Sequence, residues 1–175
     1  YRMLGFCPQD NVLWDCLTGE EHLTFYGLLK GLSGKELKVA VDASLRSVKL
    51  KFAGDRWSAG YSGGMKRRLS VANALIGQPD VVYLDEPSTG LDPAAKHNLW
   101  DIINECKGDK SLLLTTHSME EADALCDRMG IMTHGNLACI GSAPQLKQRY
   151  GAGYTCMLTT SGGNDAVSAI ADFVS

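Results

Sequence analysis

The chain has 175 residues, a length that supports one substantial hydrophobic core and is typical of one domain. Its 17 basic and 20 acidic residues give a formal net charge of −3, so we expect no general attraction to nucleic acid or to an anionic membrane. The longest apolar runs, such as VVYL and LLL, are far shorter than the ~20 residues of a membrane-spanning helix. Any membrane role therefore has to come from another segment or another chain.

The cysteines and the first residues bear on the kind of protein. Six cysteines stand at positions 7, 16, 106, 126, 139 and 156, without a C-x-x-C pair or a histidine at metal-ligand spacing. We expect buried, reduced thiols of a cytosolic domain rather than a disulfide framework or a metal site. The chain opens on YRMLGFC, without an initiating methionine or a signal peptide, which predicts a piece of a longer protein.

The first part of the chain predicts a short strand followed by a helical lobe. Residues 2–6 suit the strand, and Pro8–Asn11 suit a turn. Two capping boxes, Thr18 with Glu21 and Ser33 with Glu36, each predict the start of a helix. Apolar residues follow at helical spacing, first Leu23, Tyr26, Leu29 and Leu32, then Leu37, Val41, Leu45 and Val48. Residues 49–61 lose this periodicity and are predicted to form a loop.

The rest of the chain alternates strands with helices. A helix over 64–76 has one apolar face of Met65, Leu69, Ala72 and Ile76, and a helix begins at Asp92-Pro93 and runs to about Cys106. Residues 81–84 and 111–117 are predicted to be buried parallel strands. The remaining elements are a helix capped by a Ser118–Glu121 box, a hairpin over 131–141 that turns near Gly135-Asn136, a helix over 144–150, a strand over 154–160 and a helix over 165–174. This alternation predicts an α/β parallel sheet that carries the helical lobe as an insertion.

The stretch YSGGMKRRLS, residues 61–70, lies where a loop becomes a helix. Ser62, Gly63 and Gly64 at a helix start are suited to binding an oxyanion through backbone N–H groups and the helix dipole. The basic residues that follow, Lys66-Arg67-Arg68, lack interleaved aromatics, so we interpret them as a solvated face rather than a nucleic-acid site.

Two adjacent carboxylates, Asp85 and Glu86, follow the predicted strand 81–84. Adjacent carboxylates repel one another unless a cation binds between them and a ligand, and Mg²⁺ with nucleotide phosphates would supply that cation. A lone D-E pair is more often a solvated acidic turn. The string LDEPSTGLD that contains this pair is much more specific.

Four segments together resemble an ATP-binding cassette (ABC) ATPase. LDEPSTGLD resembles the Walker B strand and D-loop, YSGGMKRRLS the ABC signature, TTHSMEEAD the switch-histidine segment and FCPQDN the glutamine loop. The segments occur in family order and cover nearly the whole chain. LTTHSMEEADALCDRMGIM and the LACIGSAPQLKQRYG tail are similar to subfamily A, the full-length lipid and sterol transporters, and most closely to its plant-like members. Tyr61 and Met65 depart from the general L-S-G-G-Q pattern.

The resemblance implies a P-loop NTPase-like (RecA-like) parallel sheet with an inserted α-helical signature subdomain. It implies a partial ABC ATPase domain over 1–175, with the helical lobe at 12–77. The α/β core would be 1–11 and 78–160, and 161–175 would begin a C-terminal extension. The N-terminal strands and the P-loop motif, G-x-x-x-x-G-K-[ST], are not among these residues. We therefore expect the isolated chain to bind Mg-ATP weakly or not at all.

The resemblance also implies roles for individual residues. Glu86 would be the catalytic base or would position the attacking water, Asp85 would hold Mg²⁺, and Gln9 would contact both the metal and the water. His117 would be the switch histidine that contacts the γ-phosphate. In a head-to-tail pair of cassettes, Ser62, Gly63 and Gly64 would bind the nucleotide that the opposite cassette holds. Asp92 would contact the opposite cassette. An N-cap role explains Asp92 equally well.

The family resemblance implies ATP hydrolysis coupled to transport, with ATP and Mg²⁺ as cofactors. The partners would be a second cassette and the transmembrane domains of the same transporter, the cargo a lipid, and the location the cytoplasmic face of a membrane. No nucleic-acid partner is expected. Two alternatives stay open from the sequence: a non-transport ABC-type ATPase that acts on DNA or ribosomes, and a truncated or degenerate cassette without activity of its own.

Overall fold

The computed structural model describes residues 3–108 and 110–151, so the strand and helix expected over 154–160 and 165–174, and Cys156, lie outside the described residues. The chain divides into two compact units, Tyr1–Asp127 and Arg128–Ser175. The boundaries expected for the lobe and the core stay a prediction.

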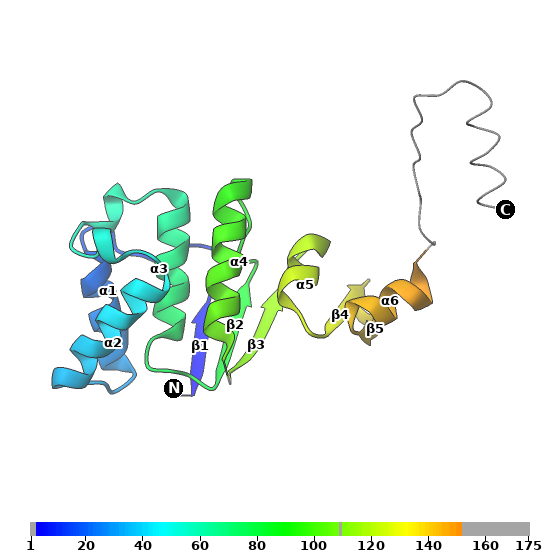
Figure 1. The fold of residues 1–175 in the computed structure, drawn as a ribbon, viewed down its shortest axis with the longest axis horizontal. Coiled ribbons are helices and arrows are strands. Elements are labelled where there is room, and N and C mark those ends of the chain that lie inside the picture. The colour runs from blue at the N-terminus through cyan, green and yellow to red at the C-terminus, as the bar shows by residue number, and fades with distance from the viewer. Residues whose placement is uncertain (1–2, 109, 152–175) are drawn as a thin grey trace, which may run out of the picture. The chain divides into compact units, whose positions relative to one another are not determined.

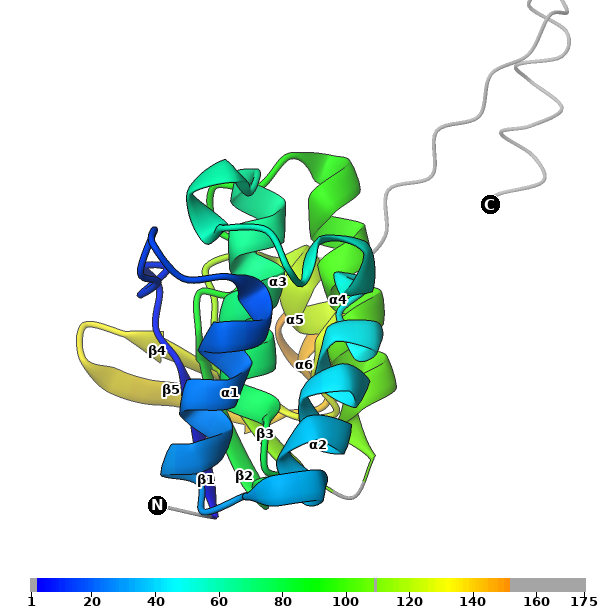
Figure 2. The same cartoon turned by 90° about the vertical axis from the view of Figure 1, so that its left-hand side faces the viewer.

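The described residues of the first unit form a three-stranded sheet and five α-helices (Figures 1 and 2). Its elements are β1 (Leu4–Cys7), α1 (Gly19–Leu29), α2 (Gly34–Ser47), α3 (Gly63–Leu75), β2 (Val81–Asp85), α4 (Pro93–Lys107), β3 (Ser111–Thr115) and α5 (Met119–Leu125). Short 3₁₀ turns at Lys51–Ala53 and Ser58–Gly60 interrupt the expected loop. The strands are parallel in the order β1-β2-β3, with Leu4 opposite Val81 and Val81 opposite Ser111. The predicted α/β class with an inserted helical lobe is confirmed.

Helix α3 lies between the lobe and the sheet, next to α4 (Figure 1). Leu69, Ala72 and Ile76 at one face belong to the core of the lobe, as predicted. Val71 and Ala74 at another face pack with Val82 and Leu84 of β2. A helix buried on two sides lacks a broad polar face, which explains why nearly every residue from Arg67 to Ala74 is buried.

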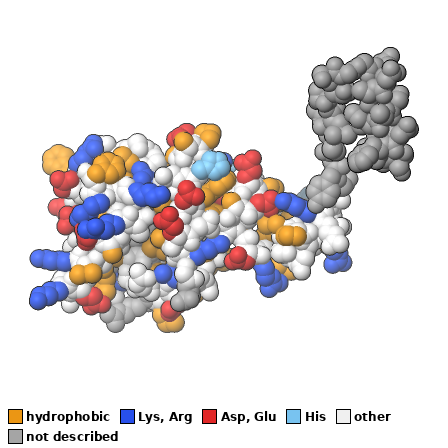
Figure 3. Space-filling model, viewed as in Figure 1, with side chains coloured by type: hydrophobic (Ala, Val, Ile, Leu, Met, Phe, Trp, Pro, Cys, Tyr) orange, Lys and Arg blue, Asp and Glu red, His pale blue; other side chains and the backbone are white. Residues whose placement is uncertain are grey.

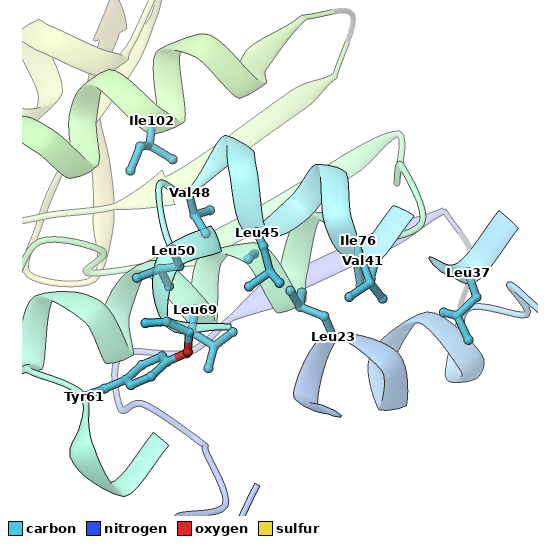
Figure 4. Close-up of a cluster of buried hydrophobic side chains, with 12 residues drawn as sticks. Leu23, Leu37, Val41, Leu45, Val48, Leu50, Tyr61, Leu69, Ile76 and Ile102 are labelled. Atoms are coloured by element: carbon cyan, nitrogen blue, oxygen red, sulfur yellow. The ribbon is translucent and has the colours of Figure 1, made fainter. Parts of the chain in front are cut away.

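The core of the lobe is formed by α1, α2, α3, the segment between α2 and α3, and one residue of α4 (Figure 4). Its buried members are Leu23, Leu37, Val41, Leu45, Val48, Leu50, Ala53, Tyr61, Leu69, Ala72, Ile76 and Ile102. The Tyr61 hydroxyl donates a hydrogen bond of 2.7 Å to the Ala53 carbonyl oxygen and so ties the segment before the signature to this core. The four apolar residues predicted on α2 are all buried here.

Several expectations for local structure were wrong. Leu29 is 62% exposed, and His22 is fully buried on α1 instead. Ser33 makes no capping hydrogen bond, because Gly34 follows it with φ +55° rather than a helical φ. The Ser118 side chain accepts a hydrogen bond from the Glu121 N–H, but the Glu121 carboxylate is buried and accepts from Trp100 Nε1 instead of closing a box.

Strands β2 and β3 are covered on one face only, although both were expected to be wholly buried. Val82 and Leu84 are covered by the helices, whereas Tyr83 is 40% and Leu113 59% exposed on the other face. Among the cysteines of the described residues, Cys7 is buried, as expected, and burial raises the pKa of its thiol to about 11. Cys16 is exposed and three others are partly exposed, which corrects the expectation of buried thiols.

The second unit is a hairpin followed by a helix. Strands β4 (Met129–Thr133) and β5 (Asn136–Gly141) pair antiparallel, and α6 (Ala143–Tyr150) follows. His134 and Gly135 both have positive φ, as a type I′ hairpin turn requires, so the turn lies one residue earlier than expected. Within the residues that the structure describes, no helix combines the length and the apolarity needed to cross a membrane.

Candidate functional site

Three candidate residues follow the carboxyl ends of adjacent parallel strands. Cys7 of β1, Leu84 of β2 and Leu114 of β3 are paired in register. Gln9 comes two residues after the first, Glu86 two after the second and His117 three after the third. Parallel register therefore brings these predicted site residues to one edge of the sheet, which is where ligands bind in open α/β folds.

Asp85 is the last residue of β2 and Glu86 begins the turn that follows, and the two side chains have different partners. The half-buried Asp85 accepts a hydrogen bond from Thr115 Oγ1 at 2.6 Å. Glu86 Oε2 lies 2.8 Å from His117 Nδ1 and 2.8 Å from Thr89 Oγ1. The two adjacent carboxylates thus have separate hydrogen-bond donors.

The ionisation of Glu86 reflects these partners. Partial burial acts to raise the pKa of its carboxyl, but hydrogen bonds from His117 and Thr89 outweigh it and hold the pKa below its usual range. The side chain of Glu86 is 19% exposed, whereas that of His117 is 75% exposed. Glu86 is therefore a charged acceptor beside a histidine that solvent or a ligand can reach.

The backbone of Glu86 is in the left-handed region, with φ +47°. This conformation is uncommon for a residue other than glycine, and such residues cluster at functional sites. The Glu86 N–H donates to the Thr115 carbonyl oxygen at 3.1 Å, which anchors the start of the turn to β3.

A second group of predicted residues lies at the adjacent N-termini of α3 and α4. Ser62 is the N-cap of α3 and accepts from the Met65 N–H at 3.3 Å, while Asp92 is the N-cap of α4 and accepts from the Ala95 N–H at 3.0 Å. These helix ends line a cavity of about 360 Å³ with Gly63 and Gly64. A Cβ on Gly64 would lie 3.3 Å from the Ala95 Cβ, so glycine permits the two helices to approach closely. Two helix N-termini at one cavity provide N–H donors and positive dipole ends for an anion.

Gln9 is exposed on the turn after β1, and its carbonyl oxygen accepts from Arg67 Nη1 at 2.9 Å. The three basic residues of the signature helix, expected to form a solvated face, have structural partners, so that expectation was wrong. Arg67 is only 2% exposed, Lys66 pairs with Asp15 at 3.1 Å, and Arg68 donates to the carbonyl oxygens at the end of α2.

Sequence reasoning missed Arg67, although the sequence contained a signal for it. Arg67, Val71 and Ala74 are spaced as i, i+4 and i+7, so they share one face of the helix. An arginine that shares a helix face with two buried apolar residues is expected to be buried as well.

Elsewhere on the first unit, basic and acidic side chains are interspersed on the face shown in Figure 3.

The donor types at the sheet edge suit Mg²⁺. No group of three His, Cys, Asp or Glu side chains within residues 3–108 and 110–151 is arranged to hold a metal ion by itself. Magnesium usually binds one or two carboxylates and keeps its other positions for water and substrate phosphates. The Asp85 carboxylate and the Gln9 amide are hard oxygen donors of this kind.

Comparison with known proteins places the chain among ATP-binding domains. Residues 9–123 match the family model described as "AAA domain, putative AbiEii toxin, Type IV TA system". The chain is 57% identical to ABC transporter A family member 12 and 58% identical to member 3 of Arabidopsis thaliana, each over 163 residues. These matches cover 92% of this chain but only 18% of each relative.

A solved structure shows the same fold. The structure titled "Structure of ATP binding subunit of ABC transporter" is 29% identical, with a TM-score of 0.72 over 97% of this chain and 68% of that chain. The fold and the similar sequences identify the class of domain as an ATP-binding cassette (ABC). The chain belongs to the AAA-domain family that this model describes, and it is identified as a portion of an ABC transporter of the A subfamily.

Proposed function

We propose that this chain supplies catalytic residues for ATP hydrolysis in a transporter of the A subfamily, and that the hydrolysis drives the movement of a lipid across a membrane. The observation that carries the proposal is the Glu86–His117 pair, 2.8 Å apart, at the sheet edge that Gln9 and Asp85 also reach. The names of the relatives, all ABC transporters, favour transport over an action on DNA or ribosomes.

In this proposal Glu86 accepts a hydrogen bond or a proton from the attacking water. The pKa of this carboxyl is lowered, so it is ionised at neutral pH, as a group that takes a proton from water has to be. His117 is exposed enough to turn from Glu86 toward a phosphate. Asp85 and Gln9 would hold Mg²⁺. When Mg-ATP is bound, ATP supplies the reacting phosphate, and Mg²⁺ supplies positive charge that offsets the negative charge of the phosphate oxygens.

Ser62, Gly63 and Gly64 serve a different nucleotide in this proposal. They would bind phosphate held by a second cassette, arranged head-to-tail, while Asp92 would lie at the contact between the cassettes. Two helix N-termini at one cavity support anion binding there. Closure and reopening of the pair would then drive the transmembrane domains from the cytoplasmic face of the membrane.

The nucleotide served by Glu86 needs a P-loop, a motif not found in the 175 residues. P-loop amides and the P-loop lysine provide much of the attraction for phosphate. We therefore expect ATP binding and turnover in the whole transporter, with weak ATP binding by the 175 residues alone.

Substitution of Glu86→Gln in the whole transporter tests the proposal. Removing the carboxylate charge removes the water's acceptor but keeps the shape and the binding groups. We expect ATP turnover to fall by 10²-fold or more, on the order of a lost general base, with nucleotide-dependent closure retained. The measurement is phosphate release, with the other cassette's hydrolysis disabled, together with trapping of nucleotide.

Glu120→Gln is the matched control, because Glu120 is an exposed glutamate of α5 that has no role in the proposed hydrolysis. It should leave turnover unchanged. Retention of full ATPase activity in Glu86→Gln would refute the role of Glu86.

A further inference from the structure

We infer that Arg67 is a positioning residue that holds the glutamine turn, residues 8–10, and the catalytic turn, residues 85–90, in one arrangement. The inference deepens the proposed function and rests on it, since it assigns a role in the same hydrolysis. Arg67 lies in the signature helix, so it also joins that helix to both turns.

All three guanidinium nitrogens of Arg67 donate to backbone carbonyl oxygens. Nη1 donates to Pro8 at 2.6 Å and Gln9 at 2.9 Å, Nε to Pro87 at 2.6 Å, and Nη2 to Asp85 at 2.9 Å and Glu86 at 3.2 Å. Two acceptors belong to the glutamine turn and three consecutive ones to the catalytic turn. One planar group thus fixes the backbone of both turns.

The burial of the Arg67 guanidinium explains why it binds these particular carbonyl oxygens. Arg67 is 2% exposed, so the N–H groups of its buried guanidinium need acceptors. The five carbonyl oxygens provide them, and the carboxylates of Asp85 and Glu86 are bound by other donors. Because Arg67 binds backbone carbonyl oxygens, it does not neutralise either carboxylate, and their charge stays available to a metal ion and to water.

The strained backbone of Glu86 strengthens the inference. A residue with φ +47° persists only where its surroundings determine its conformation. Arg67 binds the carbonyl oxygens of Asp85, Glu86 and Pro87, the residue itself and both its neighbours. Loss of these bonds would let the backbone relax and move the Glu86 carboxylate.

A lysine cannot replace Arg67 in this role. Its ammonium has one nitrogen, whereas the guanidinium presents donors in a fixed planar fork that reaches both turns at once. Arg67→Lys therefore keeps the buried charge but removes the link between the turns. Arg67→Met removes both.

The test measures the geometry of the turns and the kinetics separately. Hydrogen exchange of peptides covering 8–13 and 85–91 is measured on the 175-residue chain for wild type, Arg67→Lys and Arg67→Met. In the whole transporter, with the other cassette's hydrolysis disabled, kcat and KM for ATP are measured for the same variants. We expect faster exchange in both peptides together, and kcat lower by on the order of 10²-fold with KM within about twofold.

Two control variants separate positioning from general destabilisation. Arg46→Lys makes the same exchange at an exposed arginine of α2 paired with Asp42. Leu45→Ala opens a cavity in the core of the lobe, at a side chain that is 1% exposed. Arg46→Lys should match wild type, and Leu45→Ala should lower the melting temperature while leaving kcat per folded molecule within about twofold.

Either of two results for Arg67→Lys overturns the inference: exchange and kcat both like wild type, or faster exchange in one turn only. If Arg67→Met fails to fold, the results for Arg67→Lys are sufficient to test the inference. An inactive wild-type transporter would instead refute the proposed function, and the exchange data would still decide whether Arg67 holds the two turns together.

Discussion

At the scale of single residues, the Glu86–His117 contact shows how the backbone creates a site. Glu86 reaches His117 because β2 and β3 are paired in register and because its own φ is +47°. Hydrogen bonds from His117 and Thr89 then favour the charged carboxylate. A more usual backbone at position 86 would direct the side chain elsewhere, so the strain belongs to the site.

The lowered pKa of Glu86 makes stability depend on pH. The folded state holds this proton less tightly than the unfolded chain, whose glutamate has a pKa of about 4.3. Its contribution is therefore fully present above that pH and is lost as the pH falls through the lower folded value. We expect the difference in unfolding free energy between wild type and Glu86→Gln to be constant at pH 5–7, roughly, and to shrink below about pH 4.3.

Urea titrations of the two chains from pH 7 to pH 3 check this. Glu120→Gln, which changes an exposed carboxylate on α5, should show no comparable convergence with wild type over the same range. A difference that grows as the pH falls would contradict the assigned direction.

At the scale of elements, the two capping boxes predicted for the lobe have different outcomes. Thr18 Oγ1 accepts from the Glu21 N–H at 3.1 Å, and Glu21 Oε2 accepts from the Thr18 N–H at 2.7 Å. Ser33 makes no such bond, because the left-handed Gly34 follows it. The same sequence signal therefore stabilises one helix and not the other.

Alanine substitution of each cap tests this difference. We expect Thr18→Ala to lower the unfolding free energy by about 1 kcal/mol, the usual cost of a lost N-cap. Ser33→Ala is the matched control and should cost no more than about 0.5 kcal/mol, like other surface changes. Thermal and urea unfolding of both variants give the comparison, and equal costs would contradict the predicted difference between the two caps.

At the scale of the whole molecule, one face of the sheet in the first unit is apolar and exposed. Phe6, Tyr83 and Leu113 are opposite one another on the three strands and are 64%, 40% and 59% exposed. Contiguous apolar patches of this kind mark interaction surfaces or sites of aggregation.

We expect the 175-residue chain to self-associate through this face. Phe6→Thr with Leu113→Thr should lower the associated fraction in sedimentation velocity, because threonine removes apolar area but suits a strand. Phe52→Thr is the control, since Phe52 is 70% exposed in a 3₁₀ turn outside the sheet. Equal association of all three chains would show that this face is not the contact.

The sequence by itself determined the fold class, the family and most of the elements. Periodicity placed the α2 face of Leu37, Val41 and Leu45 in the core, because helical spacing aligns side chains whatever they pack against. The four ABC-like segments named the family that the comparisons confirm. The candidate roles of Gln9, Asp85, Glu86 and His117 also came from the sequence, and they remain proposals.

Only the tertiary structure decided which side chains meet. Arg67 is buried because α3 packs on two sides, and its partners are 18 to 59 residues away in the chain. Tyr83 and Leu113 are exposed because the helices cover only one face of the sheet. Local patterns fix periodicity and caps, whereas burial and hydrogen-bond partners depend on segments distant in sequence. For that reason the link between the glutamine turn and the catalytic turn could be found only in three dimensions.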